Sequence, residues 1–532
     1  MEQGALTPDQ LLRAITLRAR RACLLGQVLL THGMITPAQL TAALREQCGR
    51  PVINLRLHRP DRALVRLVGA EFCLRHQAIP VRRTSDGVLF ACARPDGFGP
   101  LRAALPHAMG RPRMALARRE DIHAALQKAA PQALVRRSET RVNPRESCRA
   151  WDGGRFRLIL SALAATLVVA TVLAPQALIT CLAVSAMAMF LLGSVVKIAA
   201  ASHSLRHVRR HATAQSRPAP DPPVLPPVSI LVPLFRERRI ATHLIRRLRR
   251  LDYPRELLDI RLVVEADDRT TQQAILQADP PRWMRMITVP PGSVRTKPRA
   301  MNFALDFCAG EIIGVYDAED APDRDQLRRV ARRFHECGPE VACLQGVLDY
   351  YNARTNWLSR CFTIEYATWF RVILPGLQRL GLILPLGGTT LFIRRDILEA
   401  LGGWDAHNVT EDADLGIRLA RHGYRTEFLE TVTGEEANCR LVPWIRQRSR
   451  WLKGFAMTWA VHMRNPALLI RQVGWWRFLG LQVLLPCALG QFLLAPLMLS
   501  FWLIPLGVGH PAAGLVSPQS MGWLAGAFVC SE

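Results

Sequence analysis

Two long apolar runs lie side by side in the first half of this chain, and they restrict its fold more than any other feature. They are Leu158 to Leu173 and Ala177 to Ala200, separated by Ala174-Pro175-Gln176. A helix needs about 20 apolar residues to cross a bilayer, so the first run is near the minimum length and the second is ample. We therefore predict a transmembrane helical hairpin over residues 158–200; the alternative is a buried helix pair in a soluble core.

The charges around this hairpin indicate where the rest of the chain lies. The sequence has 69 Lys and Arg against 43 Asp and Glu, a net charge of +26. Arginines crowd both outer flanks of the hairpin, at Arg136, Arg137, Arg141, Arg145, Arg149, Arg155, Arg206, Arg209 and Arg210. Because the basic residues accompany apolar segments, they favour membrane lipid as the partner and argue against nucleic acid. By the positive-inside rule, both flanks are predicted to be cytoplasmic.

Residues 1–130 are predicted to form a soluble α+β module, followed by a basic linker over residues 131–157. The first 22 residues are polar and Arg-rich, unlike a cleavable signal peptide. Thr36-Pro37 is a typical helix start. Two short strands are expected around the Asp86-Gly87 turn. The 13 cysteines are scattered and fit free thiols in a reducing compartment.

A second soluble domain is predicted over residues 218–440, where buried strands alternate with amphipathic helices. This alternation is typical of an α/β fold with a mostly parallel sheet. Three of the strands, Val228 to Phe235, Asp259 to Asp268 and Ile312 to Tyr316, end in polar or acidic residues. The carboxyl ends of parallel strands meet at one edge of a sheet, where ligands bind. The acids after Tyr316 are also the hard oxygen donors that Mg²⁺ or Mn²⁺ prefers beside phosphates.

The C-terminal part again has membrane features. Residues 441–470 combine Trp444, Trp451 and Trp459 with several Arg and Lys, as in helices that lie in the membrane interface. Residues 478–532 form a predicted C-terminal transmembrane region, with one span over 478–506 and a fourth apolar run at 522–530 that stops short. Such an ending is expected of a truncated chain.

Four acidic or basic sets occur in order along residues 226–506: Glu265 with Asp267 and Asp268; Asp317 with Glu319 and Asp320; Thr410-Glu411-Asp412; and Gln447 to Trp451. Their order and spacing resemble the processive family 2 glycosyltransferases, the cellulose, hyaluronan and poly-N-acetylglucosamine synthase type. The resemblance implies a GT-A-like nucleotide-sugar domain. The segments Gln345 to Asn352 and Gly387 to Arg395 are similar to family segments along the acceptor path.

The resemblance implies roles for the first two sets. Asp267 or Asp268 would contact the nucleotide. The family's D-x-D motif falls on Asp317-Ala318-Glu319, so Asp317 would bind the donor and a metal, Mg²⁺ or Mn²⁺, with Glu319 or Asp320 completing the metal site. Lys297 could pair with phosphates or lie in a solvated basic turn.

The last two sets would serve the transfer step. Asp412 matches the family's general base, with Glu411 beside it; Thr410 as a helix N-cap, with acids in the first turn, is a second interpretation that can hold at the same time. Gln447, Arg450 and Trp451 match the Q-x-x-R-W motif, which borders the diphosphate and acceptor sugar. Membrane anchoring is the alternative for Trp451.

The N-terminal module shows a second resemblance. The stretch Leu24 to Gln47 and the closing segment Arg119 to Leu126 are similar to the N-terminal domain of type II secretion and pilus ATPases, the MshE type, over roughly residues 20–128. Nucleotide-binding members have an Arg before the Leu-Gly pair, where this chain has Leu24. The module is therefore predicted either to bind cyclic di-GMP or to act only in docking, with secretion or export proteins as partners.

Together these features predict a multi-pass protein of a bacterial inner membrane with its soluble domains in the cytoplasm. The expected activity is inverting transfer of a sugar from a nucleotide-sugar, UDP-linked, to a growing β-linked polysaccharide. Two alternatives remain open: a non-processive transferase acting on a lipid carrier, and a signalling or receptor-like membrane protein whose transferase domain is vestigial.

Overall fold

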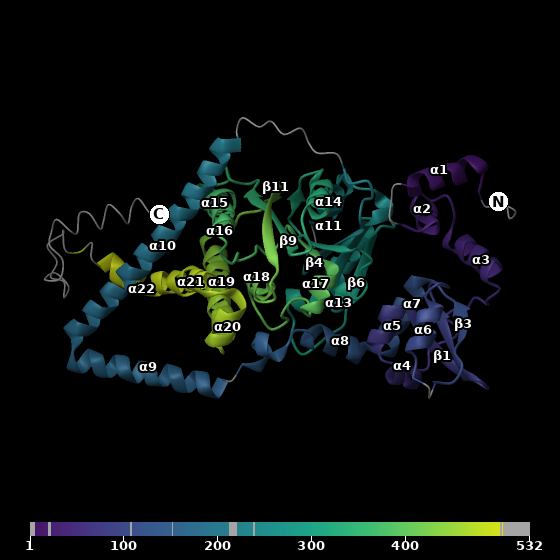
Figure 1. Ribbon diagram of the computed structural model, residues 1–532, viewed down its shortest axis with the longest axis horizontal. Coiled ribbons are helices and arrows are strands. Elements are labelled where there is room, and N and C mark those ends of the chain that lie inside the picture. Colours follow the sequence, from purple (N-terminus) through teal and green to yellow (C-terminus); the bar gives the residue numbers. More distant parts are fainter. Residues whose placement is uncertain are drawn as a thin grey trace.

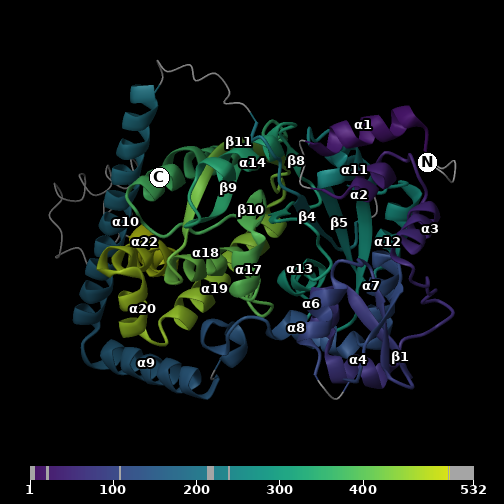
Figure 2. The same cartoon turned by 45° about the vertical axis from the view of Figure 1, so that its right-hand side comes forward.

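The computed structural model describes residues 6–19, 23–106, 109–151, 153–211, 221–237, 240–500 and 503. Figures 1 and 2 show the N-terminal helices and small sheet at one end, a large sheet domain in the middle, and long helices at the other end. The domain with the large sheet therefore lies between the N-terminal module and the long apolar helices.

The N-terminal module has a helical part and an α/β part. The first joins α1 (Pro8–Ala19), α2 (Leu25–Thr31) and α3 (Pro37–Cys48) through Ala14, Val28, Leu29 and Ile35. Thr36 and Gln39 form a capping box at the start of α3, as the Thr-Pro pair predicts. Gln27 of α2 donates to the Glu256 carbonyl at 2.8 Å, so this part contacts the sheet domain directly.

The second part of the module is an α/β unit that contains the predicted hairpin. Strands β1 (Ala78–Thr84) and β2 (Gly87–Cys92) pair antiparallel around Asp86-Gly87, and β3 (Arg113–Leu116) pairs parallel with β2. A Cβ on Gly87 would lie 2.2 Å from the Arg111 carbonyl oxygen, so the turn needs glycine. The helices of this unit are α4 (Arg62–Val68), α5 (Ala70–His76), α6 (Phe98–Ala104) and α7 (Arg119–Ala129).

The segment predicted as a basic linker is folded over most of its length. Residues 131–150, which we call the strap, contain α8 (Pro131–Thr140) and two short 3₁₀ turns, η2 (Pro144–Glu146) and η3 (Cys148–Ala150). Figure 1 shows α8 leading from the N-terminal module along the sheet domain toward the apolar helices. Leu134 and Ser138 are buried, and Arg141 pairs with Asp306 at 2.8 Å. Long-range contacts of this kind order the strap.

The two apolar runs are helical. They form α9 (Gly153–Leu173) and α10 (Pro175–His211), which diverge from the joint at Ala174 in both views. Leu158, Val172 and Leu173 of α9 are exposed by 72%, 74% and 77%. By length and composition, Pro175–Arg206 could cross a membrane and Arg157–Leu173 is a shorter apolar helix.

An eight-stranded sheet forms the centre of the second domain. Its strands are β4 (Val228–Leu234), β5 (Leu258–Glu265), β6 (Met284–Val289), β7 (Ile312–Val315), β8 (Ala321–Pro322), β9 (Val341–Tyr350), β10 (Leu391–Arg394) and β11 (Arg425–Glu435). The order is β6-β5-β4-β7-β10-β9-β11-β8. The half from β6 to β7 is parallel, as the repeated strand and helix pattern predicts, and β10 is antiparallel to both of its neighbours.

Alternate strand residues face opposite sides of this sheet and build two cores. Leu231, Val263 and Ile313 pack with Phe303 of α13, whereas Ile230, Leu262 and Val264 pack with Leu244 of α11 and Leu327 of α14. The helical segments of the domain are α11 (Ile240–Arg249), η4 (Arg255–Leu257), α12 (Arg269–Gln277), α13 (Lys297–Leu305), α14 (Gln326–Glu336), α15 (Trp357–Thr368), η5 (Trp369–Ile373), α16 (Leu374–Arg379), α17 (Arg395–Ala400) and α18 (Glu411–Arg421).

The C-terminal helices return to the apolar end of the molecule. They are α19 (Leu441–His462), α20 (Pro466–Val473), α21 (Trp475–Gln482), η6 (Val483–Cys487) and α22 (Ala488–Ser500). Trp475–Leu497 is the second stretch long and apolar enough to cross a membrane. Gln491 of α22 donates to the Met189 carbonyl of α10 at 3.2 Å, so the two candidate spans pack together. The run predicted at 522–530 lies outside the described residues.

Candidate active site

The carboxyl ends of β4, β5 and β7 meet at one edge of the sheet, and the two predicted nucleotide contacts lie there in different settings. Asp268 caps α12 by accepting from the Thr271 backbone N–H at 3.1 Å. Its other oxygen accepts from the Arg236 backbone N–H at 2.5 Å and from the Thr271 hydroxyl at 2.7 Å. Burial alone would raise its pKa, but these hydrogen bonds outweigh burial and lower the pKa. Asp267 is 59% exposed and pairs with Arg295. Asp267 is therefore the accessible member of the pair.

Lys297 links two distant parts of the edge. It begins α13, which Thr296 caps by accepting from the Arg299 backbone N–H. Its ammonium donates to Asp317 Oδ1 at 2.5 Å and to the Gly388 carbonyl at 2.8 Å. Burial opposes the charge, but attraction to Asp317 and Glu411 outweighs it and raises the pKa of Lys297. Lys297 is thus a charged bridge, and a solvated basic turn is not what the structure shows.

The three acids after β7 differ in their surroundings. Asp320 is fully buried, and its Oδ2 accepts from the Asp317 backbone N–H at 2.9 Å and from the Thr389 hydroxyl. Its Oδ1 is buried without a hydrogen-bond partner among the described residues. Asp317 is 30% exposed. Burial, then repulsion from Asp317, raises the pKa of Glu319 to about 7.

Glu411 and Asp412 begin α18, as predicted. Asp412 Oδ1 accepts from the Ala413 backbone N–H at 2.8 Å. Asp412 Oδ2 would lie 3.3 Å from a Cβ placed on Gly388, and Lys297 Nζ would lie 3.7 Å from it, so both side chains face Gly388. Burial and the proximity of Asp412 raise the pKa of Glu411; burial is also the main cause that raises the pKa of Asp412.

Thr410 does not cap α18 through its side chain in the part of the chain that the structure describes. Its hydroxyl contacts Thr458 of α19 at 3.2 Å, and Asn408 also donates to the Thr458 hydroxyl at 2.8 Å. Thr410 therefore occupies the N-cap position, with acids in the first turn as predicted, but its hydroxyl ties the start of α18 to α19 instead of capping the helix.

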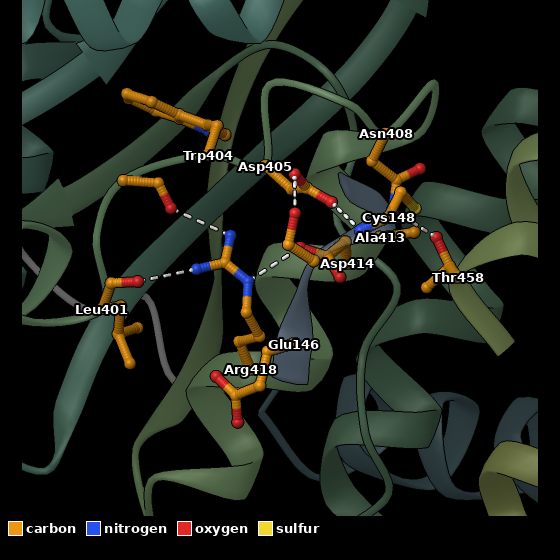
Figure 3. A network of polar contacts seen from close by, with 12 residues as sticks. Glu146, Cys148, Leu401, Trp404, Asp405, Asn408, Ala413, Asp414, Arg418 and Thr458 are labelled. Carbon is orange, nitrogen blue, oxygen red and sulfur yellow. Dashed lines mark hydrogen bonds and ion pairs between the residues drawn. The ribbon is translucent and has the colours of Figure 1, made fainter. Parts of the chain in front are cut away.

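Figure 3 shows a buried polar network around Asp414 and Arg418 of α18. Arg418, fully buried, donates to Asp414 Oδ2 at 2.7 Å and to the carbonyls of Leu401 and Gly403. Asp405 accepts from the Ser147 hydroxyl at 2.8 Å and the Cys148 backbone N–H at 2.7 Å, which brings the strap to the same network. These bonds fix the orientation of α18 relative to its neighbours.

The three residues of the predicted Q-x-x-R-W motif lie along α19. Trp451 packs against Phe362 and Tyr366, with 6.2 Å between ring centroids in each case. Gln447 accepts from the Asn438 amide at 2.7 Å. Arg450 is exposed. None of the three has a contact with Lys297, Asp317 or Asp412 among the interactions described for residues 240–500.

Comparison with known proteins identifies two regions. Residues 312–516 match the family model described as glycosyl transferase family group 2, and residues 48–136 match that of the MshEN domain. The chain contains a family 2 glycosyltransferase domain and an MshEN domain. The first match includes Asp317, Glu319, Asp320 and Asp412; the second begins after the Leu24 to Gln47 stretch.

Relatives of the glycosyltransferase domain include the "Probable glycosyltransferase YdaM" of Bacillus subtilis, 30% identical over 43% of this chain and 55% of that protein. A "Beta-monoglucosyldiacylglycerol synthase" of Synechocystis is 28% identical over 49% of this chain and 56% of its own. The chain therefore spans a little over half the length of these relatives.

Two solved structures are similar at low scores. A mannosyltransferase, PcManGT from Pyrobaculum calidifontis in complex with GDP-Man and Mn²⁺, is 19% identical with a TM-score of 0.44, covering 64% of this chain and 92% of that chain. The structure of MshE with cdg is 23% identical with a TM-score of 0.23, covering 24% of this chain and 93% of that chain.

The sequence analysis assigned no individual role to three residues near the candidate site. Gly388 connects Lys297 to Asp412, although its segment had been singled out for resemblance. Burial and repulsion from Asp320 and Asp317 raise the pKa of Glu435, which ends β11 close to the site. Arg448 lies 4.8 Å from the Trp451 ring centroid and pairs with Glu365. The acidic pair at the end of a long strand was the sequence signal that could have identified Glu435.

Proposed function

We propose that the protein is a membrane-bound inverting glycosyltransferase that transfers a sugar from a UDP-linked donor to a growing β-linked polysaccharide. The observation that carries this proposal is the Lys297 bridge. Lys297 binds both Asp317, at the end of β7, and the backbone of Gly388, which Asp412 of α18 also faces. A donor-side carboxylate, a cation and an acceptor-side carboxylate at one sheet edge are the groups that sugar transfer requires.

The donor would bind with its nucleotide toward Asp267 and its diphosphate toward Lys297 and Arg295. Arg295 pairs with the exposed Asp267, so the two mark the β5 side of the edge. Lys297 supplies a charge that can attract phosphate oxygens when donor binding displaces part of its contact with Asp317.

The acidic residues fit a divalent cation, Mg²⁺ or Mn²⁺. Glu319, Asp320, Glu411 and Glu435 all have raised pKa values, with burial as the main cause and repulsion between neighbouring carboxylates adding to it. The described residues hold no group of three or more His, Cys, Asp or Glu arranged to bind a metal alone. Mg²⁺ is commonly bound by one or two carboxylates together with substrate phosphates. Asp317 and Glu319 would therefore suffice as protein ligands, and Asp320 would support Asp317 by accepting from its backbone N–H.

When bound, the cation would neutralise the charge that develops on the leaving diphosphate. Asp412 would accept the proton of the acceptor hydroxyl as its oxygen attacks the anomeric carbon. The bond from that carbon to the diphosphate oxygen breaks on the opposite side, which inverts the configuration and releases the nucleoside diphosphate. Burial raises the pKa of Asp412, which makes it a better proton acceptor than an exposed aspartate.

The acceptor would approach along the aromatic cluster of Trp451, Tyr366 and Phe362, with Gln447 and Arg450 on the same helix. Flat apolar rings suit the faces of a pyranose. A lipid acceptor is the second candidate, because relatives of this domain carry the name beta-monoglucosyldiacylglycerol synthase. Product length distinguishes them: a ladder of sugars indicates a polysaccharide, and one sugar on an extractable lipid indicates the second candidate.

The MshEN domain would serve in regulation or docking. Leu24 lies just before α2, whose Gln27 bonds to Glu256 of the glycosyltransferase domain, and this contact favours docking. Titration of the full chain with cyclic di-GMP in a calorimeter tests the alternative, since heat of binding would show that nucleotide sensing persists with Leu24. We further propose that the protein lies in a bacterial inner membrane with both domains in the cytoplasm.

The test is turnover of a panel of UDP-sugars by the full chain in detergent with Mg²⁺ or Mn²⁺. Asp412→Asn should abolish transfer because the amide cannot accept the proton, whereas the exposed Asp396→Asn should behave as wild type. Full activity of Asp412→Asn would remove this residue as the base. Failure of the wild-type protein with every nucleotide-sugar would instead favour a receptor-like role with a vestigial transferase domain.

A further inference from the structure

The strap reaches the loop that leads into Lys297. Glu139 of α8 accepts from the Ser293 backbone N–H and from the Ser293 hydroxyl, each at 2.7 Å, and lies 3.5 Å from the Val294 backbone nitrogen. A Cβ on Gly292 would lie 2.2 Å from Glu139 Oε1 and 3.0 Å from Val135 Cγ1. Residues 290–296, which we call the donor loop, therefore pack tightly against α8.

The far side of the donor loop is held by the glycosyltransferase domain. Arg299, 1% exposed, donates to the Pro290 carbonyl at 2.9 Å and pairs with Glu265 at the end of β5. At the other end of the loop, Thr296 donates to the Ala406 carbonyl at 2.7 Å. Between these anchors lie Arg295 and the residues that Glu139 binds. Glu139 is thus a restraint on this part of the loop from outside the glycosyltransferase domain.

The strap also contacts the loop that precedes α18. The strap binds Asp405 near Cys148 (Figure 3), through the Ser147 hydroxyl and the Cys148 backbone. Ala406, the next residue, accepts from Thr296 of the donor loop. In addition, Asn302 of α13 donates to the Ser138 carbonyl of α8 at 3.0 Å. One segment between the MshEN domain and the apolar helices therefore contacts the supports of both Lys297 and Asp412.

We propose that Glu139 is a positioning residue for the sugar-nucleotide: through Ser293 it holds the donor loop in the conformation that presents Arg295 and Lys297 to the diphosphate. This inference rests on the proposed function. It also gives the strap a role beyond tethering, since movement of the MshEN domain would reach donor binding through α8. Glu139 touches no reacting atom in this scheme and acts only through the loop.

Glu139 is separable from the folding of the strap. The buried Leu134, the Arg141–Asp306 ion pair and the Asn302 bond to Ser138 hold α8 in place without it. A variant at Glu139 should therefore release the loop while α8 stays docked. Gln132, exposed on the same helix, offers a matched control.

The experiment compares Glu139→Ala, Glu139→Gln and Gln132→Ala in the full chain in detergent. Loss of hydrogen bonds to a charged acceptor should raise the KM for the UDP-sugar about tenfold in Glu139→Ala and leave kcat within about twofold, because the base is untouched. Glu139→Gln keeps an acceptor for Ser293 and should restore most of the affinity. UDP titrated with Mn²⁺ should show the same ranking, and the amide of Ser293 should exchange faster only in Glu139→Ala.

A wild-type KM and unchanged Ser293 exchange in Glu139→Ala would overturn the positioning role while leaving the proposed function intact. So would a fall in kcat alone, which a general loss of structure would give. A wild-type protein that neither binds UDP nor turns over any UDP-sugar would overturn the proposed function and this inference with it. The two failures are therefore distinguishable.

Discussion

At the scale of single residues, Glu319 and Asp320 are neighbours in sequence whose side chains have different partners. Asp320 accepts from the Asp317 backbone and the Thr389 hydroxyl inside the protein, whereas Glu319 is only partly buried. Asp320→Ala should lower the free energy of unfolding by about 2–3 kcal/mol, because a buried N–H and a hydroxyl lose their acceptor. Thermal unfolding of the full chain measures this loss.

Glu319→Gln should weaken metal binding and leave the stability of the protein unchanged. The amide is a weaker ligand for a hard cation, so Mn²⁺ affinity measured in the presence of UDP should fall about tenfold or more while thermal stability is unchanged. The exposed Glu430→Gln is the control for loss of one negative charge. Equal Mn²⁺ affinity in Glu319→Gln and wild type would leave Asp317 and Asp320 as the remaining candidate ligands.

Some features of the candidate site could be predicted from the sequence at the scale of single residues, and others could not. The position of Asp317 at the sheet edge followed from the end of a buried strand, which local sequence specifies, whereas the place of Asp412 beside it came from the family resemblance. The choice between Asp267 and Asp268 followed from neither, because it depends on Arg236 and Thr271, which reach Asp268 only in the folded chain. The capping role given to Thr410 failed for the same reason: Thr458 lies 48 residues away.

At the scale of helices and strands, α18 is held by a buried ion pair. Arg418 and Asp414 are both 0% exposed, and His462 of α19 lies 3.0 Å from the second oxygen of Asp414. Burial opposes the charge of Asp414, but Arg418 and His462 outweigh burial and lower its pKa. Arg418→Met should therefore cost about 3–5 kcal/mol of stability, since it leaves a buried charge without its partner.

Thermal or denaturant unfolding measures this cost, and Arg75→Met provides the comparison. Arg75 pairs with Glu71 on the surface of the MshEN domain and is 72% exposed, so its loss should change stability by less than about 1 kcal/mol. Equal stability of Arg418→Met and Arg75→Met would show that the buried pair does not hold α18.

The contact of α7 with the glycosyltransferase domain should depend on pH. His123 of α7 lies against Phe307, with ring centroids 5.1 Å apart, and burial, together with Arg119 and other nearby cations, lowers its pKa from 6.5 to about 3. Between these two values the unfolded chain binds a proton that the folded chain does not, so stability falls as the pH falls. The loss should be about 1 kcal/mol per pH unit.

Unfolding at about pH 7 and about pH 5 measures this dependence. His123→Phe keeps an aromatic contact with Phe307 but cannot take up a proton when unfolded, so it should lose part of the acid sensitivity. The exposed His58→Phe should retain the wild-type dependence. The same acid sensitivity in His123→Phe and wild type would assign it to other groups.

Elements with strong local patterns were predictable and those held by distant contacts were not. The run of β-branched residues at 312–316 and the Thr-Pro start of α3 have local causes, and both elements lie where expected. The strap has an Arg-rich, Pro-containing sequence typical of a linker. Its order comes from Asp306, Asp405 and Ser293, each more than 150 residues further along the chain, and no local pattern reports such contacts.

At the scale of the whole molecule, the domain order places the site between the MshEN domain and the candidate membrane spans. The N-terminal module, the strap and the glycosyltransferase domain share one continuous set of contacts, from Gln27–Glu256 to Ser147–Asp405. Domain composition was predictable from resemblance. How the domains join was not, because their interface uses side chains that look like ordinary surface polar residues in the sequence.

Two physical causes can hold the protein at a membrane: attraction of its positive charge to anionic lipid, and insertion of its apolar helices. A net charge of +26 attracts anionic lipid, but salt screens that attraction. Pro175–Arg206 and Trp475–Leu497 should keep the protein in the membrane through high salt and alkaline carbonate, because burial of apolar surface is not screened. Release of the wild-type protein by salt alone would contradict insertion and leave only surface attraction.

A substitution in the middle of α10 tests the same point within the chain. Leu191 and Leu192 are about half exposed, at 48% and 51%, so they would face lipid if α10 crosses the membrane. Arginine at the centre of a membrane helix costs about 2.5–3.5 kcal/mol on insertion scales, so the double variant Leu191→Arg and Leu192→Arg should increase the fraction extracted by carbonate. Leu57→Arg, on the MshEN domain where Leu57 is 77% exposed, adds one positive charge outside the helix and should extract like wild type. If both variants extract equally, α10 does not lie in the hydrocarbon layer, and its apolar surface must be covered by protein instead.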